Sequence, residues 1–224
     1  MKTKGVIFDF NGTLFFDNDK HIKAWGKISK LIRGVDISEE ELAQRLNGVP
    51  NKEIIQYFMN GKATSEDIEK YSLLKEAYYR EFCRKDKRNF HLVEGVEDFF
   101  SYLQKQQIPF TIASASIKEN IEFFVESFKL NQWFEINQIV YDDGTYQNKI
   151  AMFEKAADYL GVKMVDTLVF EDSFSGIANA YAAGCRQIIV ICPNNQRALY
   201  ENLPGVLKTI ETFEDSEIKR LTLS

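Results

Sequence analysis

The chain has 224 residues, of which 45% are hydrophobic and 27% are charged, the composition of an ordinary globular protein with a full core. Its formal net charge of -5 leaves no broad basic face, so nucleic acid is excluded as an expected partner. No stretch is apolar over the length that spans a bilayer, and residues 1–4 run straight into a strand-like segment. We therefore expect no membrane partner and no signal sequence.

The three cysteines are odd in number and lack the spacing of a metal site; they are Cys83, Cys185 and Cys192. This pattern predicts free thiols in a reducing compartment. A cytoplasmic location follows as the expectation.

The first predicted element is a buried strand at the start of the run Gly5–Leu14. A continuous apolar stretch of this kind is typical of a strand covered on both faces. The strand delivers one carboxylate, Asp9, to a turn at Gly12. The second residue after that carboxylate is Asn11, so an amide stands where a second acidic side chain would complete an acidic pair.

Residues 17–89 change in character and predict an all-helical insertion. They are charged and amphipathic with a helical period, and turn signals at glycine and proline separate the segments. Ser38 followed by Glu41 fits a capping box at the start of one helix. The predicted helices are Lys20–Arg33, Glu39–Leu46, Lys52–Asn60 and Ser65–Arg84.

From Val93 onward, helices and strands alternate, which predicts an α/β fold with a doubly wound, Rossmann-like parallel sheet. The expected helices are Val96–Gln107, Lys118–Phe128, Ala151–Leu160 and Ser175–Ala183. The expected strands are Phe110–Ala113, Gln138–Tyr141, Thr167–Phe170 and Gln187–Ile191. We thus expect a core domain of residues 1–16 and 90–224, and a helical cap domain of residues 17–89.

Four polar clusters fall at or just beyond the ends of predicted elements. Right-handed crossovers bring the carboxyl ends of the strands to one edge, where ligands bind, so we expect the clusters to converge. They are Asp9-x-Asn11-Gly12-Thr13, Ser114-Ala115-Ser116, Lys149 and Glu171-Asp172-Ser173.

This set of side chains is suited to phosphoryl transfer. Because a phosphate dianion repels an attacking carboxylate, Mg²⁺ held by Asp9, Asp172 and Glu171 would neutralise charge and align the attack. Lys149 would bind the phosphoryl oxygens, and Ser114 and the backbone amides after Asp9 would donate to the remainder. Asp9 would then form an aspartyl-phosphate.

Each of these residues also has a structural alternative when taken alone. A strand-end carboxylate can cap the following helix, which applies to Asp9 and to the pair Glu171–Asp172. Lys149 can be a solvated surface lysine, and Ser114 an ordinary turn serine. Their occurrence together, in this order on alternating strands, favours the functional interpretation.

The chain resembles the haloacid dehalogenase superfamily, in the branch with a helical cap that contains β-phosphoglucomutase and related sugar-phosphate phosphatases. The resemblance is carried by four segments: Val6–Leu14, Ile112–Ser116, Val169–Ile177 and Ala182–Cys185. It implies a small phosphorylated substrate, a Mg²⁺ cofactor and an aspartate nucleophile. The residues to which it gives roles in the core are Asp9 as nucleophile, Ser114 and Lys149 with the neighbouring Phe10 and Ala115 as phosphate binders, and Asp9, Asn11, Glu171 and Asp172 as metal ligands.

Within the cap, the resemblance implies that His21 and Trp25 lie near the entrance to the site, although a single histidine on a helix is also a common structural residue. Leu46-Asn47-Gly48-Val49 matches the substrate-specificity loop of the mutase. Asn51, with Lys52 beside it, stands where the mutase has an arginine for a distal phosphate, which weakens the case for a mutase. Lys75 on a later cap helix is expected either to contact substrate or to be solvated.

Lys149 lies in a segment that departs from the family pattern. The family usually follows its lysine with prolines, whereas this chain continues with Ile150-Ala151-Met152 and is about two residues shorter there.

Asn11 is the departure with the largest chemical consequence. In family members with aspartate at this position, that side chain protonates the leaving oxygen and then deprotonates the attacking water, and an amide does neither. The backbone carbonyl that the family uses for metal binding is retained. Because general acid-base help is worth about 10² to 10⁴ in rate, binding would survive while turnover falls.

Several functional interpretations of the chain stay open at this point. The first is a Mg²⁺-dependent phosphatase that uses good leaving groups such as acyl phosphates or pyrophosphate, or one in which His21 or water supplies the proton. The second is a β-phosphoglucomutase-type mutase. The third is a catalytically silent phosphometabolite-binding protein. An engineered asparagine in an active enzyme is a further explanation.

Overall fold

The computed structural model describes residues 3–46 and 49–222. The chain forms two compact units, a core unit of Met1–Phe16 with His91–Ser224 and a cap unit of Asp17–Phe90. The chain leaves the core unit after Phe16 and returns to it at His91, so Phe90 belongs to the cap unit.

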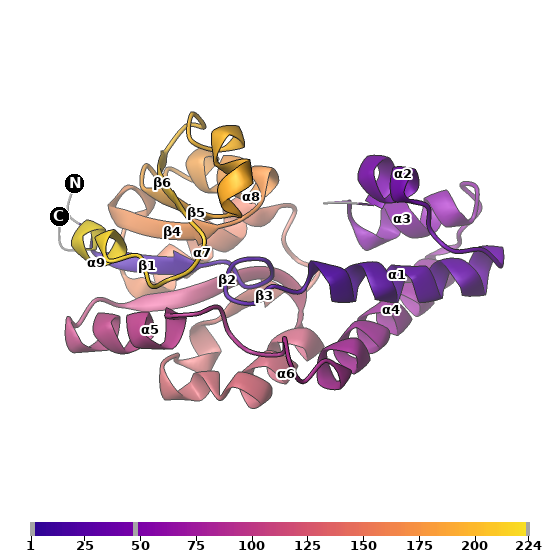
Figure 1. Cartoon of the computed structure of the whole chain (residues 1–224), viewed down its shortest axis with the longest axis horizontal. Helices are drawn as coiled ribbons and strands as arrows, with labels where there is room; N and C mark the ends of the chain where they lie inside the picture. The colour runs from indigo at the N-terminus through magenta and orange to yellow at the C-terminus, as the bar shows by residue number, and fades with distance from the viewer. Residues whose placement is uncertain (1–2, 47–48, 223–224) are drawn as a thin grey trace. The chain divides into compact units, whose positions relative to one another are not determined.

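The core unit contains a six-stranded sheet in the order β3-β2-β1-β4-β5-β6, in which every neighbouring pair is parallel (Figure 1). The predicted α/β doubly wound fold is therefore confirmed. β1 lies between β2 and β4 in the sheet, and its Val6 is paired with Phe110 of β2 on one side and with Leu168 of β4 on the other. The strands are β1 (Gly5–Phe8), β2 (Phe110–Ile117), β3 (Val140–Asp142), β4 (Thr167–Glu171), β5 (Ile188–Ile191) and β6 (Val206–Ile210).

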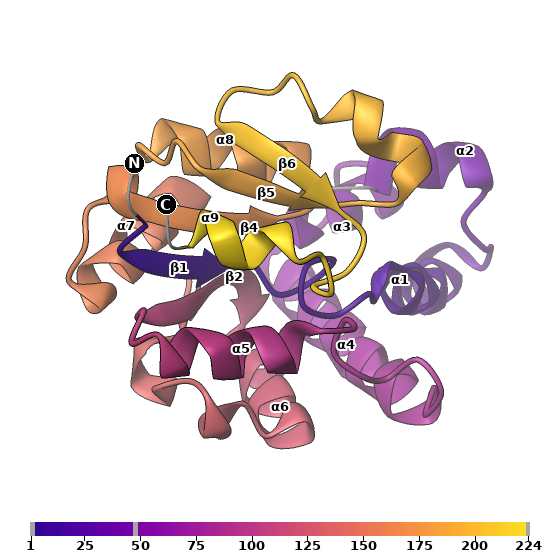
Figure 2. The ribbon, with the colours of Figure 1, turned by 60° about the vertical axis from the view of Figure 1, so that its left-hand side comes forward.

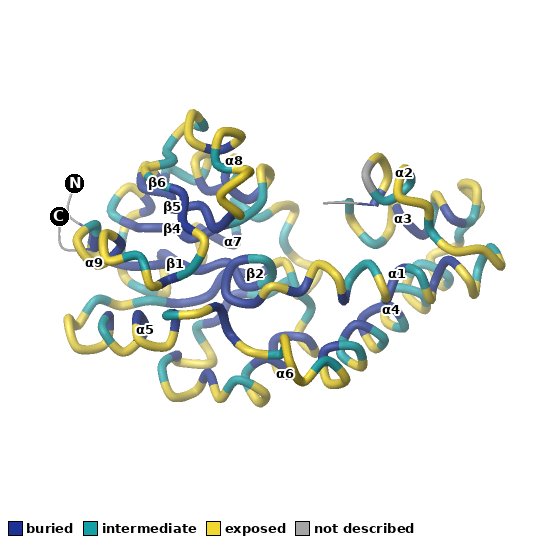
Figure 3. Tube along the Cα trace, viewed as in Figure 1, coloured by how far each residue is buried: buried dark blue, intermediate teal, exposed yellow. Residues whose placement is uncertain are grey.

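β1 is buried along its whole length because both faces of the sheet are covered. On one face, Ile7 packs with residues of α7 and α8. On the other face, the Phe8 ring stacks on Phe170 at 5.0 Å between centroids and meets Phe100 edge-on at 5.3 Å. The strands form the buried centre of the unit (Figure 3), and this packing on both faces explains why the strand sequence is continuously apolar.

The helices of the core unit pack on the two faces of the sheet, with α5 and α9 on one face and α7 and α8 on the other (Figure 2). The Tyr102 hydroxyl on α5 donates to the Lys219 carbonyl on α9 at 3.1 Å. The helices are α5 (Val96–Lys105), α6 (Lys118–Phe128), α7 (Lys149–Leu160), α8 (Phe174–Ala182) and α9 (Glu217–Leu221).

Several element boundaries differ from the sequence prediction in ways that affect the site. β2 continues through Ile117, so Ser114–Ser116 lie within the strand instead of after it. The extension pairs with β3 through a register shift, Ala113 with Val140 and Ile117 with Asp142. α7 begins at Lys149, two residues before the predicted start, and β4 includes Glu171. β6 and α9 were not predicted.

The cap unit is built from helices around its own apolar core. Ser38 accepts from the Glu41 amide while the Glu41 side chain accepts from the Ser38 amide, which confirms the predicted capping box. The predicted helix Glu39–Leu46 is divided into α2 (Glu39–Glu41) and a π-helical turn (Leu42–Leu46). The remaining helices are α1 (Asn18–Arg33), α3 (Asn51–Phe58) and α4 (Ser65–Lys85), and the core residues are Trp25, Ile28, Leu46, Ile54, Ile55 and Phe58.

The cysteines and the hydropathy of the helices bear on two predictions from composition. All three cysteines are free and buried. Within residues 3–46 and 49–222, no helix combines the length and the apolar character that crossing a membrane requires.

Candidate active site

Asp9 lies directly after β1, at the carboxyl edge of the sheet. It is 5% exposed, and its amide donates to the Phe170 carbonyl at 2.9 Å, which continues the ladder between β1 and β4. The chain then turns tightly, with the Phe10 carbonyl accepting from the Leu14 amide at 2.8 Å. Gly12 has a φ of 80°, a conformation that favours glycine. The turn fixes the direction in which the Asp9 carboxylate leaves the strand.

Lys149 links the cluster that contains Asp9 to the cluster that contains Glu171. Its Nζ lies 2.6 Å from Asp9 Oδ1 and also pairs with Glu171 Oε1. Lys149 is the first residue of α7, whose N-cap residue Asn148 accepts from the Ile150 amide at 3.0 Å. The start of the helix therefore positions the ammonium between two carboxylates, and Lys149 is not a solvated surface residue.

Glu171 is fully buried and held from both ends of its carboxylate. Its Oε2 accepts from the amides of Asp172 and Ser173, each at 2.8 Å, and from the Ser173 hydroxyl at 3.0 Å. The backbone of α8 approaches so closely that a Cβ built on Gly176 would lie 1.8 Å from Glu171 Oε1. A glycine at position 176 is thus what allows the carboxylate to occupy this place.

Asp172 connects the β4–α8 loop to the turn after β1. The Thr13 hydroxyl donates to Asp172 Oδ1 at 3.4 Å. A Cβ built on Gly12 would lie 2.1 Å from Asp172 Oδ2. The two loops are in close contact, as a shared site requires.

Ser114 and Ser116 bring β2 to the same turn. The Ser116 hydroxyl donates to Asn11 Oδ1 at 2.7 Å, and the Ser114 hydroxyl lies 3.5 Å from the same oxygen. Ser114 is buried and its Oγ accepts from the Ser116 amide at 3.2 Å, whereas Ala115 is exposed. Ser116, which was predicted as part of this cluster but without a role of its own, is therefore the closer partner of Asn11.

The charges of Asp9 and Lys149 depend on their surroundings. Burial raises the pKa of Asp9 above its usual value and the nearby Glu171 raises it further, against the opposing effect of Lys149. Burial acts to lower the pKa of Lys149, but the carboxylates of Asp9 and Glu171 outweigh it and raise that pKa above the ordinary range. The neighbouring carboxylates thus favour the charged form of Lys149, whereas this one cation does not fully offset the burial of the Asp9 carboxylate.

Three carboxylates at this edge could hold a metal ion: those of Asp9, Glu171 and Asp172 each offer an oxygen, and these oxygens lie within 4.8 Å of one another. Carboxylate oxygens are the donors preferred by hard divalent cations. Three carboxylates face one ammonium, so a further positive charge would reduce their repulsion. The donor set therefore fits Mg²⁺ in both chemistry and charge.

Phe10, which was predicted as a phosphate-binding residue, turns its side chain into the hydrophobic core. The Phe10 side chain is fully buried and stacks on Phe124 at 4.1 Å between ring centroids. Its amide donates to the Asp9 carboxylate. Phe10 contributes backbone groups at the site, and its ring belongs to the hydrophobic core.

In the cap unit, the predicted substrate residues divide between the interior and the surface. Trp25 is 5% exposed and packs edge-on against Phe58 at 6.0 Å. Asn51 donates from Nδ2 to Glu76 Oε1 at 3.0 Å, and Lys52 is exposed. Of the predicted specificity loop, Asn47 and Gly48 lie outside the described residues.

Lys75 is buried in a polar network of the cap, so the expectation that it is solvated is wrong. It is 3% exposed, and its Nζ lies 2.8 Å from both His21 Nδ1 and Glu76 Oε1. The other ring nitrogen of His21 lies 3.4 Å from Asp17 Oδ2, and the ring stacks on Tyr79 at 4.2 Å. The network is held together by α1 and α4, the two longest helices of the cap.

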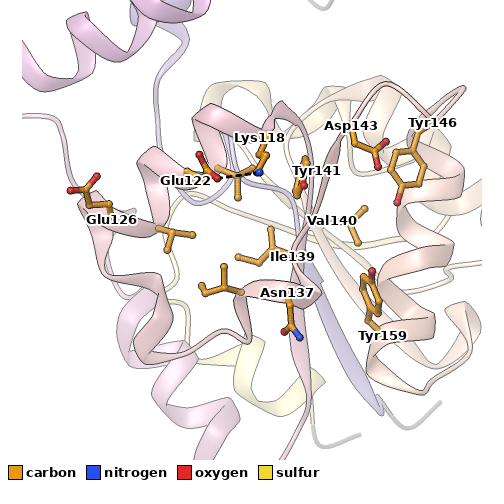
Figure 4. Close-up of a pocket in the computed structure, with 13 residues that line it drawn as sticks. Lys118, Glu122, Glu126, Asn137, Ile139, Val140, Tyr141, Asp143, Tyr146 and Tyr159 are labelled. Carbon is orange, nitrogen blue, oxygen red and sulfur yellow. Dashed lines mark ion pairs between the residues drawn. The ribbon is translucent and has the colours of Figure 1, made fainter.

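A cavity of about 430 Å³ lies elsewhere in the core unit, beside edge strand β3 (Figure 4). None of the predicted site residues lines it, so we do not assign the chemistry to this cavity. Its lining comes from α6, β3, α7 and the loops beside them: Lys118, Ile121, Glu122, Val125, Glu126, Ile136, Asn137, Ile139, Val140, Tyr141, Asp143, Tyr146 and Tyr159.

Sequence reasoning missed three residues that organise the site. Ser116 was quoted in a strand-end cluster but received no role, and the extension of β2 is what brings it to Asn11. Ser173 and Gly176 support Glu171. The signal that could have identified Ser173 and Gly176 is their spacing, because Ser173 caps α8 by accepting from the Gly176 amide.

Comparisons with known proteins agree with this architecture. The sequence model of the haloacid dehalogenase-like hydrolases matches residues 6–190. The phosphorylated carbohydrates phosphatase of Thermotoga maritima is 24% identical over 203 residues, which cover 88% of this chain and 90% of that protein. Each likeness extends over core and cap units alike.

Solved structures share the fold as well, among them two that cover nearly the whole chain. A haloacid dehalogenase hydrolase of family IA, variant 3, from Entamoeba histolytica has a TM-score of 0.90 at 36% identity and covers 99% of this chain and 98% of its own. CbbY from Rhodobacter sphaeroides, an aspartate-to-asparagine variant in complex with xylulose-1,5-bisphosphate, has a TM-score of 0.76 at 21% identity, with 95% and 96% of the two chains covered.

Proposed function

Since the chain belongs to the haloacid dehalogenase-like hydrolases, we propose that it is a Mg²⁺-dependent phosphatase of a small phosphorylated metabolite, with Asp9 as the nucleophile. The observation that carries the proposal is the contact of 2.6 Å between Lys149 Nζ and Asp9 Oδ1, with Glu171 and Asp172 beside it. A buried carboxylate next to a fixed ammonium and further acidic groups is the arrangement that attack on a phosphate dianion needs.

The residues take distinct roles in this proposal. Asp9 attacks phosphorus, Lys149 binds phosphoryl oxygens, and the Ser114 hydroxyl donates to them. Asp9, Glu171, Asp172 and the backbone carbonyl of Asn11 would hold Mg²⁺, which supplies charge neutralisation and alignment when bound. The support from Ser173 and Gly176 keeps Glu171 oriented toward the site.

A sugar phosphate is the type of metabolite that the likeness to the phosphorylated carbohydrates phosphatase supports. A phosphosugar mutase requires a second phosphate-binding group in addition. Asn51 replaces the arginine expected for that role, and its amide is bonded to Glu76 at 3.0 Å. Because the Asn51 amide is engaged by this hydrogen bond within the cap, a phosphatase is favoured over a mutase.

A screen of phosphorylated metabolites at fixed Mg²⁺ tests the proposal, with thermal shift and phosphate release measured on the same samples. At least one compound is expected to raise Tm and release phosphate. Asp9→Ala should abolish the release, and Asp158→Asn, which alters an exposed carboxylate on α7, should leave it unchanged. Release that survives Asp9→Ala would contradict Asp9 as nucleophile, and binding without release would identify a silent binding protein.

A further inference from the structure

Resting on the proposed phosphatase chemistry, we propose that Asn11 makes the site act fastest on phosphoryl donors whose leaving group departs as a stable anion, such as acyl phosphates, and slowly on sugar phosphates, whose leaving oxygen needs a proton. We propose further that the phosphate on Asp9 accumulates during turnover. Both statements follow from where the Asn11 amide is held and from the groups around it.

The Asn11 side chain is fixed at the carboxyl edge of the sheet. Its Oδ1 accepts from Ser116 at 2.7 Å and lies 3.5 Å from the Ser114 hydroxyl, and both serines are on β2. The turn that carries it is closed by the Gly12 amide, which donates to the Phe15 carbonyl at 2.8 Å. An amide in this place offers N–H donors but neither gives up nor accepts a proton at neutral pH.

The other described polar groups at these strand ends have roles that conflict with proton donation. Asp9 is the nucleophile, and Glu171 and Asp172 are proposed cation ligands. Lys149 is paired with Asp9 and Glu171 and is the proposed phosphate-binding cation. The remaining polar side chains of the four clusters are serine and threonine hydroxyls, which are weak acids. A leaving oxygen at this edge therefore departs with its negative charge.

His21 is the alternative proton donor that the sequence raised, and its surroundings oppose that role. Nδ1 lies 2.8 Å from Lys75 Nζ, and Nε2 lies 3.4 Å from Asp17 Oδ2. Both ring nitrogens thus face partners within the cap unit. A histidine that donates to substrate needs one nitrogen directed at the substrate oxygen.

The two chemical steps differ in how much they need a proton transfer. In the first, a bond forms between an Asp9 carboxylate oxygen and phosphorus while the bond from phosphorus to the leaving oxygen breaks. The electron pair goes to the leaving group, and with an acyl phosphate this group departs as a carboxylate without a proton. In the second, water attacks phosphorus, the bond to the Asp9 oxygen breaks, and the proton of water passes to solvent. Asn11 gives no base for that step, so the phosphorylated form of Asp9 builds up.

The test compares the wild type with Asn11→Asp on a series of aryl phosphates of rising leaving-group pKa: 2,4-dinitrophenyl, p-nitrophenyl and phenyl phosphate, with acetyl phosphate as the acyl donor. In the wild type, kcat/KM should fall by about 100-fold or more across the aryl series. In Asn11→Asp, the fall should be at least tenfold smaller, because acid-base help is worth about 10² to 10⁴. Asn and Asp are nearly isosteric, and matching Tm values establish that both proteins fold.

Rapid mixing with 2,4-dinitrophenyl phosphate tests the accumulation directly. The wild type should release a burst of dinitrophenolate stoichiometric with protein, followed by slow turnover, and Asp9→Ala should show no burst. Equal dependence on leaving group in wild type and Asn11→Asp, or a linear wild-type time course, would overturn this inference and leave the phosphatase proposal intact. No turnover of any donor by either protein would overturn the phosphatase proposal itself.

Discussion

The Ser116 hydroxyl donates to Asn11 Oδ1 at 2.7 Å, whereas Ser114 lies 3.5 Å from the same oxygen. Two serines of one strand therefore differ in what they can do. Ser116 makes the shorter hydrogen bond and orients the side chain at position 11, whereas Ser114, two residues earlier and buried, makes the longer one, so its proposed donation to a phosphate would break only a weak bond.

Separate substitutions of these serines should have different kinetic effects, measured in the Asn11→Asp protein to give a strong signal. Ser114→Ala should weaken phosphate binding by about tenfold or more, since a hydrogen bond to a charged group is worth about 1.5 to 3 kcal/mol. Ser116→Ala should lower kcat and change KM little, because the carboxylate at position 11 loses its orientation. Inhibition by inorganic phosphate measures the phosphate affinity, and steady-state kinetics on a phosphorylated substrate measure kcat and KM. The same effect from both substitutions would show that the serines are not specialised.

Asn11→Asp should raise Mg²⁺-dependent hydrolysis of a hexose phosphate by at least about tenfold, a floor below the usual value of general acid-base catalysis. The carboxylate can protonate the sugar oxygen as it leaves, and the amide cannot. Phosphate release at saturating Mg²⁺ measures the gain. If the variant binds Mg²⁺ and gains nothing, the acid-base role of this position is wrong.

Much of the fold follows from local pattern. The buried run before Asp9 and the alternation after Val93 predict the parallel sheet, because period and turn residues are properties of short segments. β6 escapes this reasoning since Val206–Ile210 is half exposed and has Lys208 at its centre. Lys208 is accommodated by ion pairs with Asp215 at 2.8 Å and with Glu217, contacts that only the folded chain brings together.

The site was predictable to the extent that topology gathers strand ends. Asp9, Lys149 and Glu171 come together, as expected of clusters at one edge of a sheet. Finer features depend on distant packing: Ser116 reaches Asn11 because β2 continues, and Lys75 is buried because α4 packs on α1. Spacing along the chain carries no signal for either.

Gly176→Ala should impair metal binding and turnover. The new Cβ would lie 1.8 Å from Glu171 Oε1, so the carboxylate must leave its place between Lys149 and the amides of the β4–α8 loop. We expect the Mg²⁺ concentration for half-maximal activity to rise by about tenfold or more, corresponding to about 1.4 kcal/mol.

Gly26→Ala is the matched control for this helix glycine. A Cβ added at Gly26 would meet only the Asp36 side chain, with Oδ1 at 3.1 Å. Alanine is also a better helix former than glycine, by up to about 1 kcal/mol. The control should keep the Mg²⁺ dependence of the wild type. An unaltered Mg²⁺ response in Gly176→Ala would show that the Glu171 position is not needed for the metal.

Lys75→Met should destabilise the cap strongly. Lys75 Nζ and Glu76 Oε1 form a buried ion pair at 2.8 Å, and removing one partner of such a pair costs about 3 to 5 kcal/mol. Urea denaturation of the full chain at neutral pH, followed by a probe of the cap, measures the loss. Lys70→Met, which alters an exposed lysine on the same helix, should change the free energy of unfolding little.

The pH dependence of stability gives a second measure of the same pair. Burial acts to raise the pKa of Glu76, but Lys75 and His21 outweigh it and hold that pKa below the ordinary glutamate value of 4.5. A group with a lowered folded pKa stabilises the protein above its unfolded pKa, and this contribution is lost as the pH falls through the folded pKa. In the wild type, the free energy of unfolding should therefore decrease as the pH is lowered from neutral through the acidic range below 4.5.

In Lys75→Met, the pKa of Glu76 rises because its main positive neighbour is gone, so this component of the decrease should vanish or reverse. Parallel pH profiles for the two proteins would show that Lys75 does not set the charge of Glu76.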